Sequence, residues 1–253
     1  MPTTHRIRWV DINGDGISEL VNLPMLGAGS TQTDSEIPVQ MVYYTVPVNP
    51  RIDDWPITVI DSSLHLSHGI SIFKWDDDPA GEILAASSDG LTLFDFDENQ
   101  WGRVTLTSGH EGDGRVNRGA GEVAAGNLEG NTKRFLASIE PWHGNEVVLY
   151  TETENKLWER KVIDTTFVDG HAIACYDLNN DGFDEILAGH RGKTYNLYIY
   201  QYIPEHNHWE RTELDQGGMS TAGVHVFDAN QDGIPDIAAS GSATGNIVLY
   251  QGR

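Results

Sequence analysis

One acidic segment occurs three times in this chain, with the pattern D-x-N-x-D-G-x-x-(D/E) followed by an apolar residue. The three copies are residues 11–19, 177–185 and 228–236. Each copy crowds carboxylates and an amide around a glycine that permits a sharp turn, and without a cation the carboxylates would repel one another. An EF-hand would carry Glu at position twelve, where this chain has Asn22, Ala188 and Ala239. The closing acid at position nine therefore indicates a different, strand-to-strand metal loop.

A hard, oxygen-preferring ion, Ca²⁺ or Mg²⁺, is the expected occupant of each loop. We predict ligands at positions one, three, five, seven and nine, with the backbone carbonyl serving at position seven. These are Asp11, Asn13, Asp15, Ile17, Glu19, Asp177, Asn179, Asp181, Phe183, Glu185, Asp228, Asn230, Asp232, Ile234 and Asp236. The alternative is a set of Asx turns that hold no ion.

A second signature, a segment that begins with Trp, follows each acidic loop. Its copies are residues 55–61, 158–164 and 209–215, with a looser copy at 101–107. Apolar and polar positions alternate after each Trp, which predicts half-exposed strands. Because these four tryptophans recur with the strand period, we expect them to pack inside the repeats.

Aligning the copies gives five units that begin near His5, His68, Gly121, His171 and Ala222. Each unit has the order strand, acidic loop, strand, short loop, strand, turn, Trp strand, and the period is near fifty residues. This is typical of a β-propeller with four-stranded blades. We predict an all-β fold and one domain over residues 1–253. The last blade lacks its outer strand, unless the chain is one part of a longer propeller.

Two of the five loops are degenerate. In the second unit Lys74, Asp76, Asp78 and Glu82 take the metal positions, so the lysine ammonium could replace the ion. In the third unit residues 126–132 contain too few acids, and we expect no metal there.

The charge balance excludes some partners. Lys and Arg total 16 against 38 acids, a net charge of −22. Binding to nucleic acid depends on phosphate neutralisation, so both nucleic acid and anionic membrane surfaces are disfavoured. The single cysteine, Cys175, is expected to be a small core residue. The sequence shows no signal peptide or spanning segment, which makes the cytoplasm the default location and leaves export open.

Seven of the ten histidines map to the blade side opposite the acidic loops. They are His5, His65, His68, His110, His143, His171 and His190. Inner-strand starts from different blades converge near a channel mouth, where a ligand would bind. His is suited to proton transfer near neutral pH and also binds Zn²⁺ or similar ions. The alternative is that a repeated His at a strand start is a structural peg, bonded to a neighbouring blade's backbone.

The acidic loops resemble the FG-GAP or VCBS repeats of integrin-type propellers, lectins and polysaccharide lyases. From about residue 5 to 250 the chain also resembles the propeller part of the aldos-2-ulose dehydratase family. The segments that carry this resemblance are 5–11, 61–68, 140–146, 169–171 and 243–246. The resemblance implies a seven-bladed propeller that removes water from 1,5-anhydrofructose or a related ketosugar. It also implies cupin domains with a later isomerase step, but we count five blades and no cupins, so isomerase activity is not carried over.

Dehydrating a ketosugar needs a base, an electrophile at the carbonyl and an acid for the departing hydroxyl. We predict His68 and His171 as base or metal ligands, and His143 and Glu140 on the acid side. Arg191 or a His-bound divalent ion such as Zn²⁺ would polarise the carbonyl. The expected substrate-binding residues are His5, His110, Trp142 and His190.

The expected partner is a small sugar or glycan, with no nucleic acid and no membrane, and the oligomeric state is left open. Two alternatives remain at this point. One is a lyase for uronic-acid polymers, which uses nearly the same groups. The other is a noncatalytic calcium-binding propeller that binds a glycan or a protein.

Overall fold

The computed structural model describes residues 3–98, 100–129 and 133–253. It divides into two compact units, Met1–Glu122 and Val123–Arg253, and each is described by itself. The described residues contain antiparallel strands and two short 3₁₀ turns, Arg115–Asn117 and Pro204–His206, with no α-helix among them. None of the described helices is long and apolar enough to cross a membrane.

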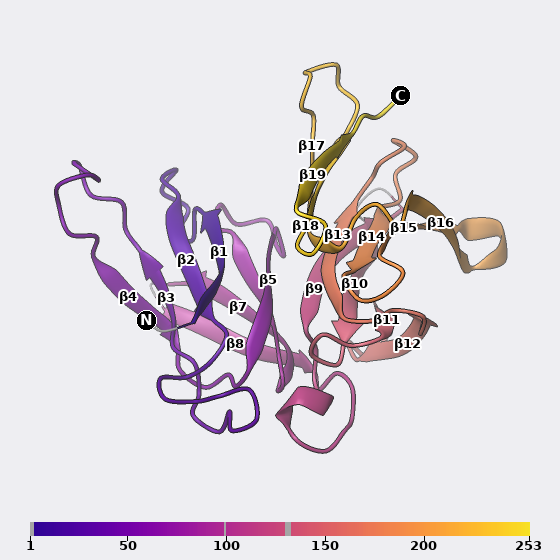
Figure 1. Ribbon diagram of the computed structural model, residues 1–253. Coiled ribbons are helices and arrows are strands. Elements are labelled where there is room, and N and C mark those ends of the chain that lie inside the picture. Colours follow the sequence, from indigo (N-terminus) through magenta and orange to yellow (C-terminus); the bar gives the residue numbers. More distant parts are fainter. Residues whose placement is uncertain (1–2, 99, 130–132) are drawn as a thin grey trace. The chain divides into compact units, whose positions relative to one another are not determined.

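The first unit contains two four-stranded sheets, in the orders β1-β2-β3-β4 and β5-β6-β7-β8 (Figure 1). Their strands are β1 (Thr4–Val10), β2 (Glu19–Pro24), β3 (Met41–Tyr44), β4 (Ile57–Asp61), β5 (Ser67–Phe73), β6 (Glu82–Ser87), β7 (Gly90–Asp97) and β8 (Gln100–Thr107). Each sheet is a simple meander, because every strand pairs with its neighbour in sequence.

The second unit contains two further four-stranded sheets and one sheet of three strands. Their strands are β9 (Glu122–Leu128), β10 (Lys133–Glu140), β11 (Glu146–Glu152), β12 (Trp158–Asp164), β13 (Gly170–Tyr176), β14 (Glu185–His190), β15 (Asn196–Ile203), β16 (His208–Gln216), β17 (Thr221–Phe227), β18 (Asp236–Gly241) and β19 (Asn246–Tyr250). The unit boundary falls at the start of β9.

The sheets are β-propeller blades, and the predicted all-β, β-propeller class is confirmed. The five inner strands begin at residues 4, 67, 122, 170 and 221, each within one residue of the predicted unit starts. The fifth blade has three strands, as predicted. That the chain forms one domain stays a prediction.

Burial falls from the middle of each blade to its outer edge. All six residues of β6 and of β14 are buried, whereas β8 and β16 are mostly exposed. A strand that is buried on both faces has a continuous run of apolar residues. In an edge strand, apolar residues alternate with polar or charged ones. This gradient explains the sequence pattern of the Trp segments, which form the outermost strands.

The cores lie between successive blades inside each unit. In the first unit, residues such as Val10 and Met41 of the first blade cluster with Ile83 and Phe94 of the second. In the second unit one cluster joins the third and fourth blades and another joins the fourth and fifth. Trp209 is 7% exposed, and its ring lies 5.2 Å from that of Phe135.

Polar contacts also join neighbouring blades at their outer strands. The Asp164 carboxylate, at the end of β12, accepts hydrogen bonds from Tyr200 Oη and Arg211 Nη1, each at 2.7 Å. Asp215 accepts one from Tyr250 Oη at 2.8 Å in the same way. Asp164 and Asp215, which close the Trp segments 158–164 and 209–215, are therefore inter-blade staples, contacts that join one blade to the next, and Arg211 of the W-x-R pattern takes part in the first of them.

Candidate functional site

The first acidic loop is folded by its own backbone. The Asp15 and Gly16 amides donate to the Asp11 carboxylate at 3.1 and 2.8 Å, and the Ile17 amide donates to Asp15 Oδ1 at 2.8 Å. Gly16 has φ +86°, a conformation that glycine adopts without strain. The closing acid Glu19 accepts a hydrogen bond from the Ile12 amide at 3.3 Å. The carboxylates are thus oriented before any ligand binds.

The other two full loops repeat these contacts. The amides of Asp181 and Asp232 donate to the first Asp of their loop, both at 3.1 Å. Burial, followed by the negative charges of Asp181 and Asp177, raises the pKa of Glu185 to about 7. An oxygen-preferring cation would relieve this repulsion. The donor set therefore fits Ca²⁺ or Mg²⁺, and the ion itself stays a prediction.

In the degenerate loop of the second blade, the Lys74 ammonium contacts the loop backbone. It donates to the Asp78 carbonyl and, at 2.7 Å, to the Ala80 carbonyl. Ala80 occupies position seven, whose carbonyl is a predicted metal ligand in the full loops. The lysine charge thus takes over part of the role expected for an ion. The degenerate third loop falls partly outside the described residues.

On the opposite side of the blades, a β-bulge places a residue at the start of four inner strands. The pairing of β13 with β14 shifts register between Gly170 and Ala172, so His171 is the extra residue. The same shift occurs around His5, around His68 and around Ala222. Bulges re-aim a side chain and often lie next to active sites. The recurring histidine position therefore has a geometric cause.

Two of these histidines bond to a backbone carbonyl. His171 Nδ1 lies 2.8 Å from the Ala222 carbonyl oxygen, and His68 Nδ1 lies 3.1 Å from that of Gly121. A carbonyl oxygen can only accept a hydrogen bond, so Nδ1 must be the donor. Each neutral ring therefore carries its proton on Nδ1 and leaves Nε2 as the basic nitrogen. The peg interpretation fits both rings, and the same bond leaves Nε2 as the nitrogen that could act as a base or a metal ligand. The His171 side chain is buried, at 4% exposure, and so is that of His190.

The second unit brings several predicted residues together. The rings of His143 and Trp142 stack with centroids 4.1 Å apart, and the His171 ring lies 5.1 Å from that of His143. His143 Nδ1 lies 3.1 Å from Arg191 Nη2 and 3.3 Å from Asp169 Oδ1, while Arg191 Nε donates to Asp169 at 2.9 Å. Three predicted catalytic residues and the predicted aromatic platform thus form one group, which we call the His143 cluster.

The His143 cluster also holds unusual backbone. His143 has φ +51° and Asp169 has φ +59°, a region that non-glycine residues rarely adopt. Such conformations cost of order 1–3 kcal/mol each and gather at functional sites. His143 Nδ1 faces both a donor, Arg191, and an acceptor, Asp169.

Two predicted residues lie elsewhere in the second unit. Glu140 is fully buried and accepts hydrogen bonds from Tyr150 Oη at 2.7 Å and from Arg160 Nη2 at 2.8 Å. His190 is 1% exposed, and burial lowers its pKa. The geometry therefore favours a structural role for Glu140 rather than the predicted acid, and it gives His190 no exposed surface for the predicted substrate contact.

The first unit contains the other predicted residues. The His5 and His68 rings lie 4.3 Å apart, and His68 Nδ1 is also 2.9 Å from Glu122 Oε1. His110 lines a separate cavity of about 400 Å³, together with Asp89, Ser108, Glu111 and Arg118. Zn²⁺ binding at the histidines stays a prediction.

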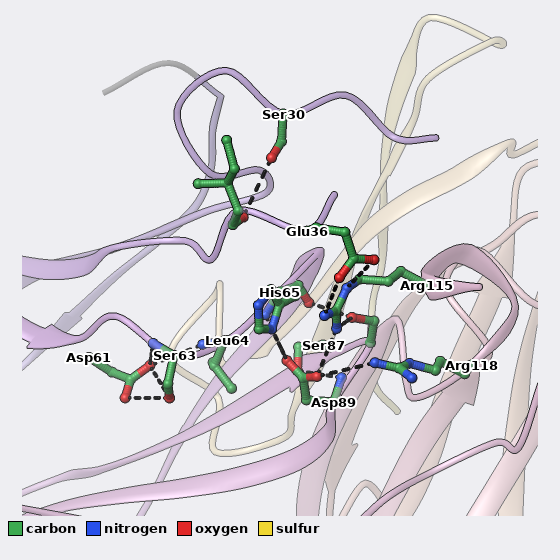
Figure 2. A network of polar contacts seen from close by, with 12 residues as sticks. Ser30, Glu36, Asp61, Ser63, Leu64, His65, Ser87, Asp89, Arg115 and Arg118 are labelled. Atoms are coloured by element: carbon green, nitrogen blue, oxygen red, sulfur yellow. Dashed lines mark hydrogen bonds and ion pairs between the residues drawn. The ribbon is translucent and has the colours of Figure 1, made fainter. Parts of the chain in front are cut away.

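Figure 2 shows the polar network next to this cavity. Asp89 Oδ2 accepts hydrogen bonds from the His65 backbone amide and from its Nδ1, at 2.8 and 2.9 Å. Arg115, from the inserted loop, donates to Asp89 at 3.0 Å and to both carboxylate oxygens of Glu36, at 3.2 and 2.9 Å. Burial opposes the Arg115 charge, but Glu36 and Asp89 outweigh it and raise the pKa of Arg115. The ion pairs of Arg115 therefore hold the inserted loop against Asp89 and Glu36.

Sequence reasoning missed Asp89 and Asp169 as partners of histidines. Each precedes a glycine, Gly90 or Gly170, and an Asp-Gly pair is an ordinary turn signal. Spacing along the chain gives no sign that either acid would orient an imidazole contributed by a different loop.

The blades, their acidic loops and the inter-blade staples define the class: a β-propeller of FG-GAP type. A model of the FG-GAP-like repeat matches residues 177–239. The model of the aldos-2-ulose dehydratase β-propeller domain matches residues 1–153. Because that match covers more than half of the chain, the protein belongs to the aldos-2-ulose dehydratase β-propeller family.

Individual relatives agree with both assignments. Aldos-2-ulose dehydratase of Phanerodontia chrysosporium is 25% identical over 292 aligned positions, which cover 99% of this chain and 31% of the relative. Integrin alpha-6 of Gallus gallus is 29% identical over 130 positions, 44% of this chain and 12% of the relative. Integrin alpha-7 of Mus musculus is 31% identical over 96 positions, 33% of this chain and 8% of the relative. The chain thus spans less than a third of the length of each of these relatives.

Proposed function

We propose that this protein is a carbohydrate-active hydro-lyase that removes water from a ketosugar such as 1,5-anhydrofructose. The observation that carries the proposal is the His143 cluster, in which His143, His171 and Arg191 meet beside Trp142. These residues come from three separate segments of the sequence. Membership of the aldos-2-ulose dehydratase propeller family supports the same class of substrate.

The cluster supplies the groups that the elimination needs. His171 Nε2, left unprotonated by the bond from Nδ1 to Ala222, removes the proton next to the keto group. The electron pair of the broken C–H bond forms the new C=C bond as the hydroxyl leaves. His143 supplies the proton that turns this hydroxyl into water, and Asp169 stabilises the charge state in which His143 holds that proton. The product is an enone and one water molecule.

Arg191 and Trp142 position the sugar. A guanidinium has five N–H donors, of which one bonds to Asp169 and one to His143. The others can polarise the keto oxygen, so that negative charge is stabilised as the proton leaves. The half-buried indole of Trp142 is assigned to stacking against a sugar ring. We place no catalytic step on Glu140.

Ultraviolet absorbance of the enone tests the proposal, with 1,5-anhydrofructose, a panel of ketosugars and uronate polymers as substrates. We expect His171→Gln and His143→Gln each to lower the rate by roughly 10²–10⁴-fold, the usual size of general acid–base catalysis. His225→Gln, an exposed histidine on β17 outside the cluster, is the matched control and should retain the wild-type rate. If wild type, folded and supplied with Ca²⁺, forms no enone from any substrate, the hydro-lyase proposal is wrong.

A noncatalytic propeller that binds a glycan or a protein is the second candidate. It is favoured by the peg bonds of His68 and His171, which by themselves are structural. The FG-GAP-like match to relatives named as integrins points the same way. Binding of a glycan without turnover, lost in Trp142→Ala, would establish this alternative. Unsaturated uronate products would instead identify a uronate lyase.

A further inference from the structure

We propose that the degenerate loop of the second blade binds a divalent, oxygen-preferring cation through Asp76, Asp78, Glu82 and Asp95. One carboxylate oxygen from each of these residues lies within 4.8 Å of the other three. Three of the four come from the loop and the start of β6, but Asp95 comes from β7. This ligand set differs from that of the three full loops, in which every expected ligand lies inside the loop.

The lysine explains why the ligand set has moved. Lys74 occupies position one, where the full loops have Asp11, Asp177 and Asp228. Its ammonium already satisfies the Asp78 and Ala80 carbonyls, so position one and the carbonyl of position seven no longer serve an ion. The side-chain carboxylates of Asp78 and its neighbours are not engaged by this contact.

The strand register supplies the replacement. Ile83 pairs with Phe94 across β6 and β7, which places Glu82 opposite Asp95. By the same register, the closing acids of the three full loops face neutral residues, namely Thr45, Gln201 and Gln251. Like charges directly opposite each other destabilise a strand pair. The second blade, which has lysine in place of the acid at position one, thus has an acid at the cross-strand position instead.

Burial makes a bare carboxylate cluster costly at this place. Glu82 is fully buried, and one of its oxygens accepts a hydrogen bond from the Trp75 amide. Its other oxygen, Oε1, is buried with no hydrogen-bond partner among the described residues, as are Asp78 Oδ1 and Asp95 Oδ1. Leaving a buried charged acceptor unsatisfied costs more than leaving a buried neutral acceptor unsatisfied. One cation at the centre of the four side chains would satisfy all three oxygens.

The donor chemistry selects the class of ion. All four side chains offer carboxylate oxygens, and no nitrogen or sulfur ligand belongs to the group. Oxygen-only sites suit Ca²⁺, Mg²⁺ or Mn²⁺ rather than Zn²⁺. Lys74 offsets one of the four negative charges, so a divalent ion leaves the site close to neutral.

Tb³⁺ and ⁴⁵Ca²⁺ binding to the full chain test the proposal. Trp75 lies between Lys74 and Asp76 in sequence, so its indole can sensitise emission from Tb³⁺ bound at this site. We expect Asp95→Asn to bind one Ca²⁺ fewer per chain, or to bind it roughly 10–100-fold more weakly, and to lose part of the Tb³⁺ emission. Trp75→Phe should lose the same part of the emission while keeping the wild-type number of bound Ca²⁺ ions.

The matched control is Asp97→Asn, an exposed acid two residues further along β7 that is not a member of the group. It should bind the wild-type number of ions with unchanged affinity. Asp76→Asn, in the exposed part of the loop, gives a second way to remove a ligand if Asp95→Asn does not fold. Equal ion number and affinity in wild type and in the ligand variants would overturn the proposal. A ligand variant that is more stable than wild type in metal-free buffer, with unchanged ion binding, would also overturn the proposal. That result would identify a proton shared by Glu82 and Asp95 in place of an ion.

Discussion

Replacing Glu140 by Gln should destabilise the second unit without removing a catalytic acid. The Glu140 carboxylate is fully buried, and its Oε2 accepts from Arg160 Nε at 3.0 Å and from Nη2 at 2.8 Å. Ser138 and Tyr150 donate to its other oxygen. Gln would place an N–H group among these donors and leave the Arg160 charge without its buried partner.

The size of the effect follows from the burial of the pair. Breaking a fully buried ion pair costs about 3–5 kcal/mol. The Arg160 side chain is 30% exposed and also contacts Glu146, so water and the second acid reduce this to roughly 2–3 kcal/mol. For a unit of this size the change corresponds to a fall of roughly 8–12 °C in the unfolding midpoint. Thermal unfolding followed by circular dichroism measures it.

A matched variant and a double-mutant cycle isolate the cause. Glu152→Gln, an exposed acid on β11, should leave the midpoint unchanged. Arg160→Met combined with Glu140→Gln should cost less than the sum of the two single changes, because the uncompensated guanidinium is then absent. Enone formation should survive Glu140→Gln when it is assayed well below the midpoint. A variant that keeps the wild-type midpoint but loses activity by two orders of magnitude would refute this reasoning and restore Glu140 as the acid.

Two further predictions concern the staples and the acidic loops. Asp164→Asn should cost about 1–3 kcal/mol by weakening the bonds from Tyr200 and Arg211. Burial opposes the Asp164 charge, but the hydrogen bonds from Thr166, Tyr200 and Arg211 outweigh it and lower the pKa of Asp164. The stability that these bonds contribute is therefore present above the ordinary carboxyl pKa and is lost as pH falls through the lower pKa of the folded state. Acid titration of wild type and Asp164→Asn checks the sign, and parallel curves below pH ~4 would contradict it. Removing metal with a chelator should lower the unfolding midpoint, and Ca²⁺ at 100 times its dissociation constant should restore about 2.7 kcal/mol of stability per site. Asp181→Asn should show this gain at one site fewer. An unfolding midpoint that changes with neither chelator nor Ca²⁺ would identify the loops as Asx turns without an ion.

The sequence predicts the blades well because their information is local and repeated. Each acidic loop folds through hydrogen bonds within nine residues, as between the Gly16 amide and Asp11, and each Trp segment is one edge strand. Aligning five imperfect copies shows the positions that the copies share, so that differences in any one copy matter less. The sequence therefore predicts the unit starts to within one residue, even for the third blade, whose loop is degenerate.

The sites are harder to predict because they depend on where side chains from different repeats meet. The sequence of its own loop predicts His143, but Asp169 is contributed by the connection before β13, and only folding places its Oδ1 3.3 Å from His143 Nδ1. For Glu140 the geometry favours a role other than the predicted one. Its neighbours in sequence suggest an acid beside His143, whereas strand alternation sends its side chain to Tyr150 and Arg160. Proximity in sequence is a poor guide at the end of a strand, where one residue changes the face.

The repeat itself shows which part of the recurring histidine position is structural. The inner-strand bulge recurs around His5, His68, His171 and Ala222, and the blade with Ala222 forms the same bulge without an imidazole. The bulge therefore does not require histidine, and the bond from Nδ1 to a carbonyl is not needed to build a blade. Histidine at this position adds a ring whose Nδ1 proton is hydrogen-bonded to a backbone carbonyl, which leaves Nε2 as the basic nitrogen. In the second unit that ring lies 5.1 Å from the ring of His143, which in turn contacts Asp169 and Arg191, and the proposed elimination depends on this arrangement.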